Sequence, residues 1–223
     1  MNSPHITGKI TLYPGVFSDL TMIHLFVIYP MQLDSNGKRD NGTKCEAAEA
    51  NFWSINFRDH TGQYVVIADC DTEQTANALF QLFNSFSAKS LLNFLPDYDY
   101  NDIRNLAPRP DDDFQISITL YPDNYNIPYL FHEMKILRRS TTGADPVEFN
   151  QDYTTQDETA NPPVIYSLFL YKMDDPQYIL TADFNDKFGA FMLMYVLYLI
   201  SLTSVFGEAV KRFPNTLDRL GDS

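Results

Sequence analysis

Short runs that mix β-branched, aromatic and polar residues recur along the first third of the chain. Ile10–Pro14 reads ITLYP and Met22–Tyr29 reads MIHLFVIY. Phe52–Asp71 then reads as two runs separated by Asp59–Gly62, which has the composition of a tight turn. Runs of this length and composition are typical of strands rather than helices. The first part of the chain therefore predicts four strands in succession.

The same series recurs in the second half of the chain. Ile118–Pro122 again reads ITLYP, and Tyr129–Leu137 is the next apolar run. Tyr166–Asn185 then aligns with Phe52–Asp71 without a gap. In this alignment Ala68-Asp69 matches Ala182-Asp183, so an acidic residue closes the fourth strand of each series. The recurrence predicts an internal duplication.

A helix is predicted after each series of strands. In the first, the apolar residues Leu79, Leu82, Phe83 and Phe86 recur at intervals of three and four, as in a helix with one buried face. The second, Phe188–Gly207, contains no charged residue, so it is surrounded either by protein or by lipid. Because a milder helix occupies the matching place, we expect protein. A tail anchor in a membrane is the alternative.

These elements predict an α+β fold. We expect a tandem duplication of a four-stranded antiparallel meander followed by one helix (β4α–β4α), with two sheets packed with the helices in a pseudo-twofold arrangement. The first repeat would occupy residues 1–96 and the second 116–214, joined by an acidic, Pro-rich linker at 97–115 and followed by a polar tail at 215–223. Asp71 and Asn185 are the predicted N-caps of the two helices.

The order of these elements resembles that of the Whirly family, whose members bind single-stranded nucleic acid. The resemblance covers most of the chain but consists of element order alone. Whirly proteins carry a basic Lys-Gly-Lys segment on a strand, and this chain has no such segment. The resemblance therefore implies a related layout without the nucleic-acid function.

The charge of the chain excludes some classes of partner. A formal net charge of -13 disfavours binding to a phosphate backbone and favours a basic protein partner. The N-terminus has no basic start followed by an apolar run, so we expect a cytoplasmic protein. The two cysteines, Cys45 and Cys70, are too few for a disulfide framework and are expected to be unpaired thiols.

Few residues suggest catalysis or metal binding. His24 and His132 occupy matching predicted strands, and Asp69 and Asp183 end matching strands, where capping of the following helix is the simplest role. A catalytic carboxylate pair would require the two strand ends to meet. The acidic run that begins at Asp97 departs from a calcium-binding loop at the positions of Gly and Glu. We expect no cofactor, no metal and no enzymatic activity.

The acidic and Tyr-rich connecting segments are the predicted functional region. Acids steer association with a basic partner, and tyrosines supply contact area. The sequence therefore predicts a non-enzymatic binding module of inhibitor or immunity type. The alternatives are a self-assembling subunit, for instance a homodimer joined through Phe188–Gly207, and the tail-anchored membrane protein. The predicted partner-binding residues are Asp97, Tyr98, Asp99, Tyr100, Asp111, Asp112, Asp113, Asp145, Glu148, Asp152, Tyr153, Asp157 and Glu158.

Overall fold

A computed structural model describes residues 5–17, 25–39, 41–58, 61–87, 115–125, 131–140, 147–148, 164–172 and 178–212. The strands of the first half are β1 (Ile6–Leu12), β2 (Leu25–Gln32), β3 (Thr43–Lys44), β4 (Phe52–Arg58) and β5 (Tyr64–Cys70). Those of the second half are β6 (Ile116–Leu120), β7 (Phe131–Ser140), β8 (Val147–Glu148), β9 (Val164–Lys172) and β10 (Tyr178–Phe184). The helices are α1 (Glu73–Ser87) and α3 (Lys187–Arg212). Short 3-10 turns follow β1 at Pro14–Phe17, precede β4 at Ala47–Glu49 and follow β6 at Pro122–Asn124.

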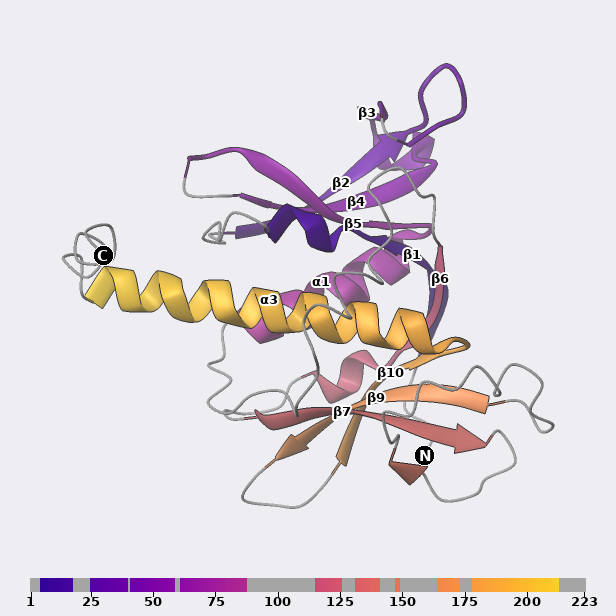
Figure 1. Ribbon diagram of the computed structural model, residues 1–223. Coiled ribbons are helices and arrows are strands. Elements are labelled where there is room, and N and C mark those ends of the chain that lie inside the picture. Colours follow the sequence, from indigo (N-terminus) through magenta and orange to yellow (C-terminus); the bar gives the residue numbers. More distant parts are fainter. Residues whose placement is uncertain are drawn as a thin grey trace.

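The strands form one continuous ten-stranded sheet in the order β3-β2-β4-β5-β1-β6-β10-β9-β7-β8. The predicted arrangement of two packed sheets is therefore wrong. The predicted meander is also wrong, because β1 pairs with β5 and β6, whereas β2 pairs with β3 and β4. Figure 1 shows how one sheet replaces two: it bends, so that β2, β4 and β5 lie on one side of the helices and β7, β9 and β10 on the other.

The antiparallel pairing of β1 with β6 joins the two halves. It runs from Ile6 opposite Leu120 to Ile10 opposite Ile116. Without it, each of these strands would expose a row of unpaired backbone N–H and C=O groups at a sheet edge. Each of the two strands ends in the repeated sequence ITL, and because the pairing is antiparallel the two copies lie toward opposite ends of the joint.

The two faces of the sheet differ in what covers them. On the inner, concave face, residues such as Ile10 and Ala68 pack against the helices in the main hydrophobic core. Because side chains alternate along a strand, Thr11 and Asp69 point to the opposite, outer face, where they are paired across β1 and β5. The outer face carries the polar clusters described below.

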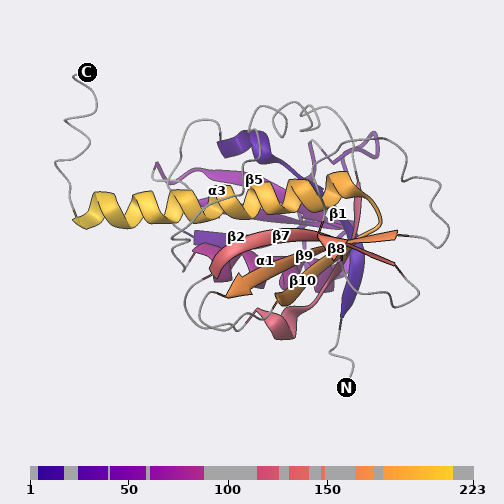
Figure 2. The ribbon, with the colours of Figure 1, turned by 60° about the horizontal axis from the view of Figure 1, so that its bottom comes forward.

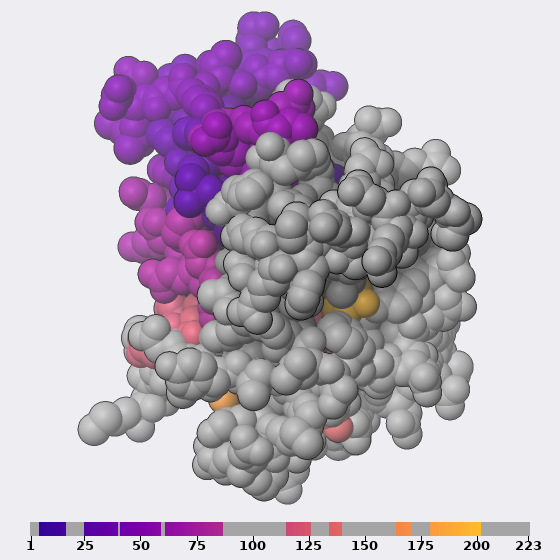
Figure 3. Space-filling model, turned by 90° about the vertical axis from the view of Figure 1, so that its left-hand side faces the viewer, coloured from indigo at the N-terminus to yellow at the C-terminus, as the bar shows by residue number. Residues whose placement is uncertain are grey.

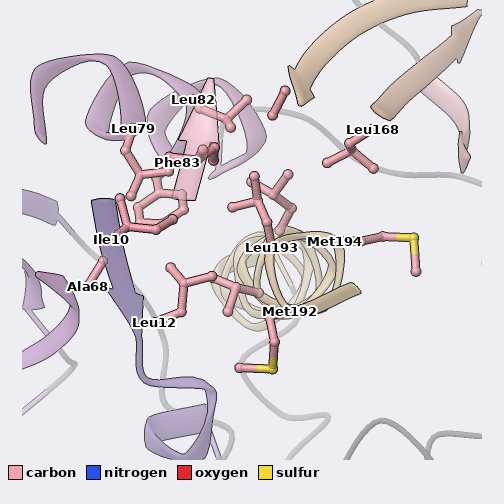
Figure 4. Packing of buried hydrophobic residues seen from close by; sticks show 14 of the residues in the cluster. Ile10, Leu12, Ala68, Leu79, Leu82, Phe83, Leu168, Met192, Leu193 and Met194 are labelled. Atoms are coloured by element: carbon pink, nitrogen blue, oxygen red, sulfur yellow. The ribbon is translucent and has the colours of Figure 1, made fainter. Parts of the chain in front are cut away.

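The helix α3 lies within the core, and Figures 1 and 2 show it extending along the concave side of the sheet. Every residue from Gly189 to Tyr198 is buried. Figure 4 shows why: the successive residues Met192, Leu193 and Met194 point in three different directions from the helix, and Leu193 points toward Leu82 and Phe83 of α1. The expectation that protein surrounds this helix is confirmed for these side chains. Among the described residues, the structure contains no helix that is both long enough and apolar enough to span a membrane.

The N-cap of each helix lies one residue later than the sequence predicted. Thr72 Oγ1 accepts a hydrogen bond from the Thr75 N–H at 3.1 Å, and Asp186 Oδ1 accepts one from the Gly189 N–H at 2.6 Å. These side chains satisfy N–H groups that have no partner within the helix. The predicted N-caps Asp71 and Asn185 are therefore wrong by one position.

Glycine is required where α3 approaches the sheet most closely. A Cβ atom on Gly189 would lie 2.4 Å from Ile116 Cγ2 and 3.1 Å from Phe184 Cδ1. Real Cβ atoms do not approach other atoms this closely, so a larger residue would push the start of α3 away from β6 and β10.

Candidate functional site

The outer face of the sheet carries a buried polar cluster in the first half, which we call the Asp69 cluster. It consists of Tyr13, Ser54 and Asp69. The Tyr13 hydroxyl donates a hydrogen bond to Asp69 Oδ2 at 2.8 Å, and the Ser54 hydroxyl donates one to Asp69 Oδ1. Asp69 and Ser54 are buried and paired across β5 and β4. One carboxylate thus connects β4 and β5 to the residue that follows β1.

The second half carries a matching cluster that includes an arginine, and we call it the Asp183 cluster. The Tyr121 hydroxyl donates to Asp183 Oδ2 at 2.6 Å, and the Ser167 hydroxyl donates to Asp183 Oδ1. Arg139 on β7 donates through its terminal Nη2 to both carboxylate oxygens at 2.7 Å, and through Nε to Ser167 Oγ at 2.7 Å. The guanidinium therefore supplies a charge-assisted pair as well as a bridge to β9.

A bulge in the last strand of each half positions the tyrosine of each cluster. The register between β4 and β5 skips Ile67, and that between β9 and β10 skips Thr181. The freed carbonyl of Ile67 accepts from the Tyr13 N–H at 3.0 Å, and that of Thr181 accepts from the Tyr121 N–H at 3.3 Å. These backbone bonds hold each tyrosine at the end of its strand, with its hydroxyl over the aspartate.

The structure also corrects the alignment of the two halves. Ser54 and Asp69 are 15 residues apart, whereas Ser167 and Asp183 are 16 residues apart. The second hairpin is therefore one residue longer, and the gapless alignment, which matched Ser54 with Leu168, is wrong by one residue before the turn. This shift concealed the matching serines, which periodicity alone could not identify.

The two clusters do not meet. β1 and β6 separate β5 from β10, so three strand spacings, about 14 Å at the usual spacing, lie between the aspartates across the sheet. They are also offset along the strands, because Asp69 lies opposite Thr11 of β1 whereas Asp183 aligns through Thr119 of β6 with Thr7. A shared carboxylate pair for acid–base catalysis is thereby excluded at these positions. Capping of the following helix is also wrong for both aspartates, because their carboxylates bind hydroxyl groups on the outer face.

The hydrogen bonds and the protonation of the Asp183 cluster favour a structural role over a catalytic one. Burial, followed by the hydrogen bond to the Asp183 carboxylate, raises the pKa of the Tyr121 hydroxyl to about 12. The phenol therefore remains protonated and continues to donate at neutral pH. A carboxylate whose oxygens accept from Tyr121, Ser167 and Arg139 is constrained as a structural acceptor.

A cluster of aromatic rings and cations lies on the outer face of the first half. The rings of Tyr29 and Tyr64 meet edge to face, with centroids 5.8 Å apart. Lys44 Nζ lies 3.2 Å from the centroid of Tyr29, and Arg58 Cζ lies 6.0 Å from that of Tyr64. Tyr64 is 45% exposed, so this aromatic–cation cluster is accessible to a partner. Figure 3 shows residues of the first half, indigo to purple, at the surface.

The predicted partner-binding residues lie almost entirely outside the described part of the chain. Glu148 is the exception: it lies in β8, where its backbone pairs with Leu137 of β7 at the edge of the sheet. The residues outside the described ranges are Asp97, Tyr98, Asp99, Tyr100, Asp111, Asp112, Asp113, Asp145, Asp152, Tyr153, Asp157 and Glu158.

The predicted pairing of His24 with His132 cannot be followed, because only His132 lies within the described residues. His132 lies in β7 at an irregularity in its register with β9, and His24 falls outside the described residues. Within the described residues, no group of three or more His, Cys, Asp or Glu side chains could hold a metal ion. Cys45 and Cys70 are both free, and burial raises the pKa of the Cys70 thiol.

Sequence patterns contained part of the signal for the two clusters. The tyrosine and aspartate lie in the repeated ITLYP and Ala-Asp segments, but nothing local indicates that they contact each other. Arg139 and the aromatic–cation cluster were missed altogether. Comparison of the chain with protein-family models, with curated proteins and with solved structures found no match, so its function must be argued from its own residues.

Proposed function

We propose that the protein is a non-enzymatic binding module, of inhibitor or immunity type, that holds a basic protein partner through its acidic connecting segments. The observation that supports this most is the distribution of charge. The described residues contain 12 of the 29 acidic and 12 of the 16 basic residues. The remaining 17 acidic and 4 basic residues account for the whole net charge of -13 and belong to the other segments.

Charge that is concentrated in connecting segments suits recognition of a basic surface. Residues 141–163, which connect β7 to β9, contain five acidic and no basic residues. Residues 88–114, which connect α1 to β6, contain six acidic and three basic residues, together with Tyr98 and Tyr100. A neutral frame that carries acidic segments combines electrostatic steering with aromatic contact area. The described side chains of α3 are covered by the chain itself, and we place no partner there.

Affinity capture with matched variants tests this proposal. The tagged protein is incubated at low salt with lysate from its natural source, and captured proteins are eluted with increasing salt. We expect one stoichiometric basic protein that elutes as the ionic strength rises, because exposed charges are screened within about 10 Å at 0.1 M salt. The test variant changes Asp97, Asp99, Asp111, Asp112 and Asp113 to Asn.

The control variant changes two acidic residues of the frame, Glu46 and Glu49, to Gln. Both residues are exposed, so their replacement alters charge without disturbing the core. Capture should be lost in the Asp-to-Asn variant and retained in the control. If both variants capture the partner equally, or if the wild-type protein recovers no basic protein, the proposal is wrong.

A further inference from the structure

One edge of the sheet is left partly unpaired in the first half. On one side, β2 pairs with β4 along its length, from Leu25 to Met31. On the other side, it pairs with β3 only at Met31 and Gln32. Within the described part of the chain, no strand pairs with the outer side of β2 from Leu25 to Tyr29. This free edge differs from the interior strands, each of which has a partner on both sides.

The direction of the free backbone groups follows from one hydrogen bond. The Cys45 N–H donates to the Pro30 carbonyl at 3.1 Å, so the backbone of Pro30 points to the outer side of β2. Because these directions alternate along a strand, Phe26 and Ile28 also direct their N–H and C=O groups outward. Pro30 has no N–H to offer, so the usable edge ends there.

The side chains beside this edge are also incompletely covered. Leu25 is 53% exposed, and Val27 and Tyr29 on the same face are partly exposed. Natural proteins usually protect such edges with charges, bulges or a covering element, because a free edge is a template for another strand. β2 carries no charged residue from Leu25 to Gln32. A second strand would satisfy the backbone groups and cover the exposed leucine.

We propose that β2 pairs with β2 of a second copy of this chain, antiparallel about a twofold axis at Val27. Phe26 of each copy then lies opposite Ile28 of the other, and each such pair exchanges two hydrogen bonds. Val27 lies opposite its own counterpart, and Leu25 lies opposite Tyr29. The result is an isologous interface that joins two sheets edge to edge.

A second copy suits this edge because the edge is self-complementary. The Cys45 N–H already occupies the Pro30 carbonyl, so an incoming strand can pair with β2 only on the Leu25 side of Pro30. The same segment of a second copy directs the same N–H and C=O groups outward, so the two match when they run antiparallel. Residues 25–58 contain four acidic and four basic residues, so two copies meet here without a local excess of negative charge. This inference is independent of the acidic segments and differs from the dimer through Phe188–Gly207.

Disulfide trapping tests the register directly. In a non-hydrogen-bonded antiparallel pair, the two Cα atoms are about 4.5 Å apart, which is within the range of about 4.4–6.8 Å that a disulfide spans. Val27→Cys in a Cys45→Ser background should therefore form a covalent dimer under mild oxidation. The control is Val66→Cys in the same background: Val66 is partly exposed on the outer face of the interior strand β5. It should remain monomeric under oxidation.

Sedimentation velocity of the full chain provides a second readout. The wild-type protein and Val66→Lys should both form a dimer. Val27→Lys should raise the dissociation constant of the dimer at least tenfold, because two like charges would face each other across the axis. Circular dichroism checks that both variants are folded. A wild-type monomer at all concentrations, a dimer that is unaffected by Val27→Lys, or equal cross-linking of Val66→Cys would each overturn the proposal. If the protein is a monomer, the edge of β2 would instead be a candidate for pairing with a strand of another protein.

Discussion

The Asp69 and Asp183 clusters occupy matching places in the sheet but differ in how they are held together. In both, a tyrosine that follows the first strand and a serine on a neighbouring strand donate to a buried aspartate. In the second cluster, Asp183 also receives the guanidinium of Arg139 from β7, and this arginine is 29% exposed. The position of β2 that corresponds in register to Arg139 is Met31, which carries no charge.

This difference shows which features the two halves share and which they do not. The hydroxyl donors are placed by backbone features, namely the bulges at Ile67 and Thr181, and these are the same in both halves. The arginine is placed by a side chain alone, and a side chain can change without altering the strand order. A similar exchange distinguishes Tyr29, which forms part of the aromatic–cation cluster, from the buried Leu137 at the corresponding position.

The largest effects are expected from two single variants, each of which removes the aspartate acceptor from one cluster. Asp183→Ala should lower the free energy of unfolding by about 3 kcal/mol, because Tyr121, Ser167 and Arg139 all lose a buried acceptor. Asp69→Ala should lower it by about 2 kcal/mol, because the hydroxyls of Tyr13 and Ser54 lose their acceptor. Urea denaturation of both variants measures the difference. Equal losses would show that the arginine adds nothing to the second cluster.

Removal of the arginine should have the next largest effect. Arg139→Met makes the second half resemble the first and should lower the free energy of unfolding by about 1.5 kcal/mol, discounted because the arginine is partly exposed. When Asp183 is already Asn, Arg139→Met should lower the free energy of unfolding much less, because it no longer leaves a buried charge without its partner. A double-mutant cycle in urea measures the coupling. If the coupling is zero, the ion pair does not stabilise the fold.

The tyrosines test the part that the two clusters share. Tyr13→Phe and Tyr121→Phe should each lower the free energy of unfolding by about 1 kcal/mol, because each removes one hydroxyl donor to a buried carboxylate. Thermal unfolding measures both. A much larger loss for one of them would mean that the clusters are less alike than their geometry indicates.

The raised pKa of Tyr121 adds a dependence on pH. Since the folded protein holds this phenol protonated to about pH 12 and the ordinary value is 10.0, its contribution to stability is fully present below pH 10.0. It is lost as the pH rises from 10.0 toward about 12. Urea denaturation across this range should show a smaller decline for Tyr121→Phe than for the wild-type protein. An identical decline would contradict the shift.

The smallest effect concerns the cation above Tyr29. Lys44→Met keeps much of the side chain but removes the charge, and it should lower the free energy of unfolding by about 0.5 kcal/mol, as for other exposed cation–π contacts. Lys38→Met, at an exposed lysine outside this cluster, provides the comparison. Thermal unfolding at low and high salt distinguishes loss of this contact from general charge effects.

Strand positions were largely predictable, whereas strand partners were not. The runs at Ile10–Pro14 and Phe52–Asp71 indicate strands because their composition and length are local properties. The pairing of β1 with β5 and β6 connects residues far apart in the chain, and no local pattern specifies it. The strands β3 and β8 contain two residues each, which is too few to form a recognisable pattern.

The candidate site shows the same limit. Tyr13 and Asp69 each lie in a repeated segment, which draws attention to them. The contact between their side chains depends on the bulge at Ile67, which neither segment indicates by its own pattern. Arg139 gave no signal, because an arginine near the end of a strand is ordinary until its partner is known. The register decides which residues share a face, and a single inserted residue in the second hairpin moved Ser167 out of the gapless alignment.

The sequence by itself determined that a series of strands precedes each of two helices, that one helix is apolar on all sides, and that acidic residues are concentrated in connecting segments. These follow from composition and periodicity, which act over a few residues. Only the tertiary structure decided that ten strands form one bent sheet, that two buried carboxylates face away from the helices, and that part of β2 is left without a described partner. Those features depend on which distant segments exchange hydrogen bonds, and the backbone groups that pair are the same for every sequence.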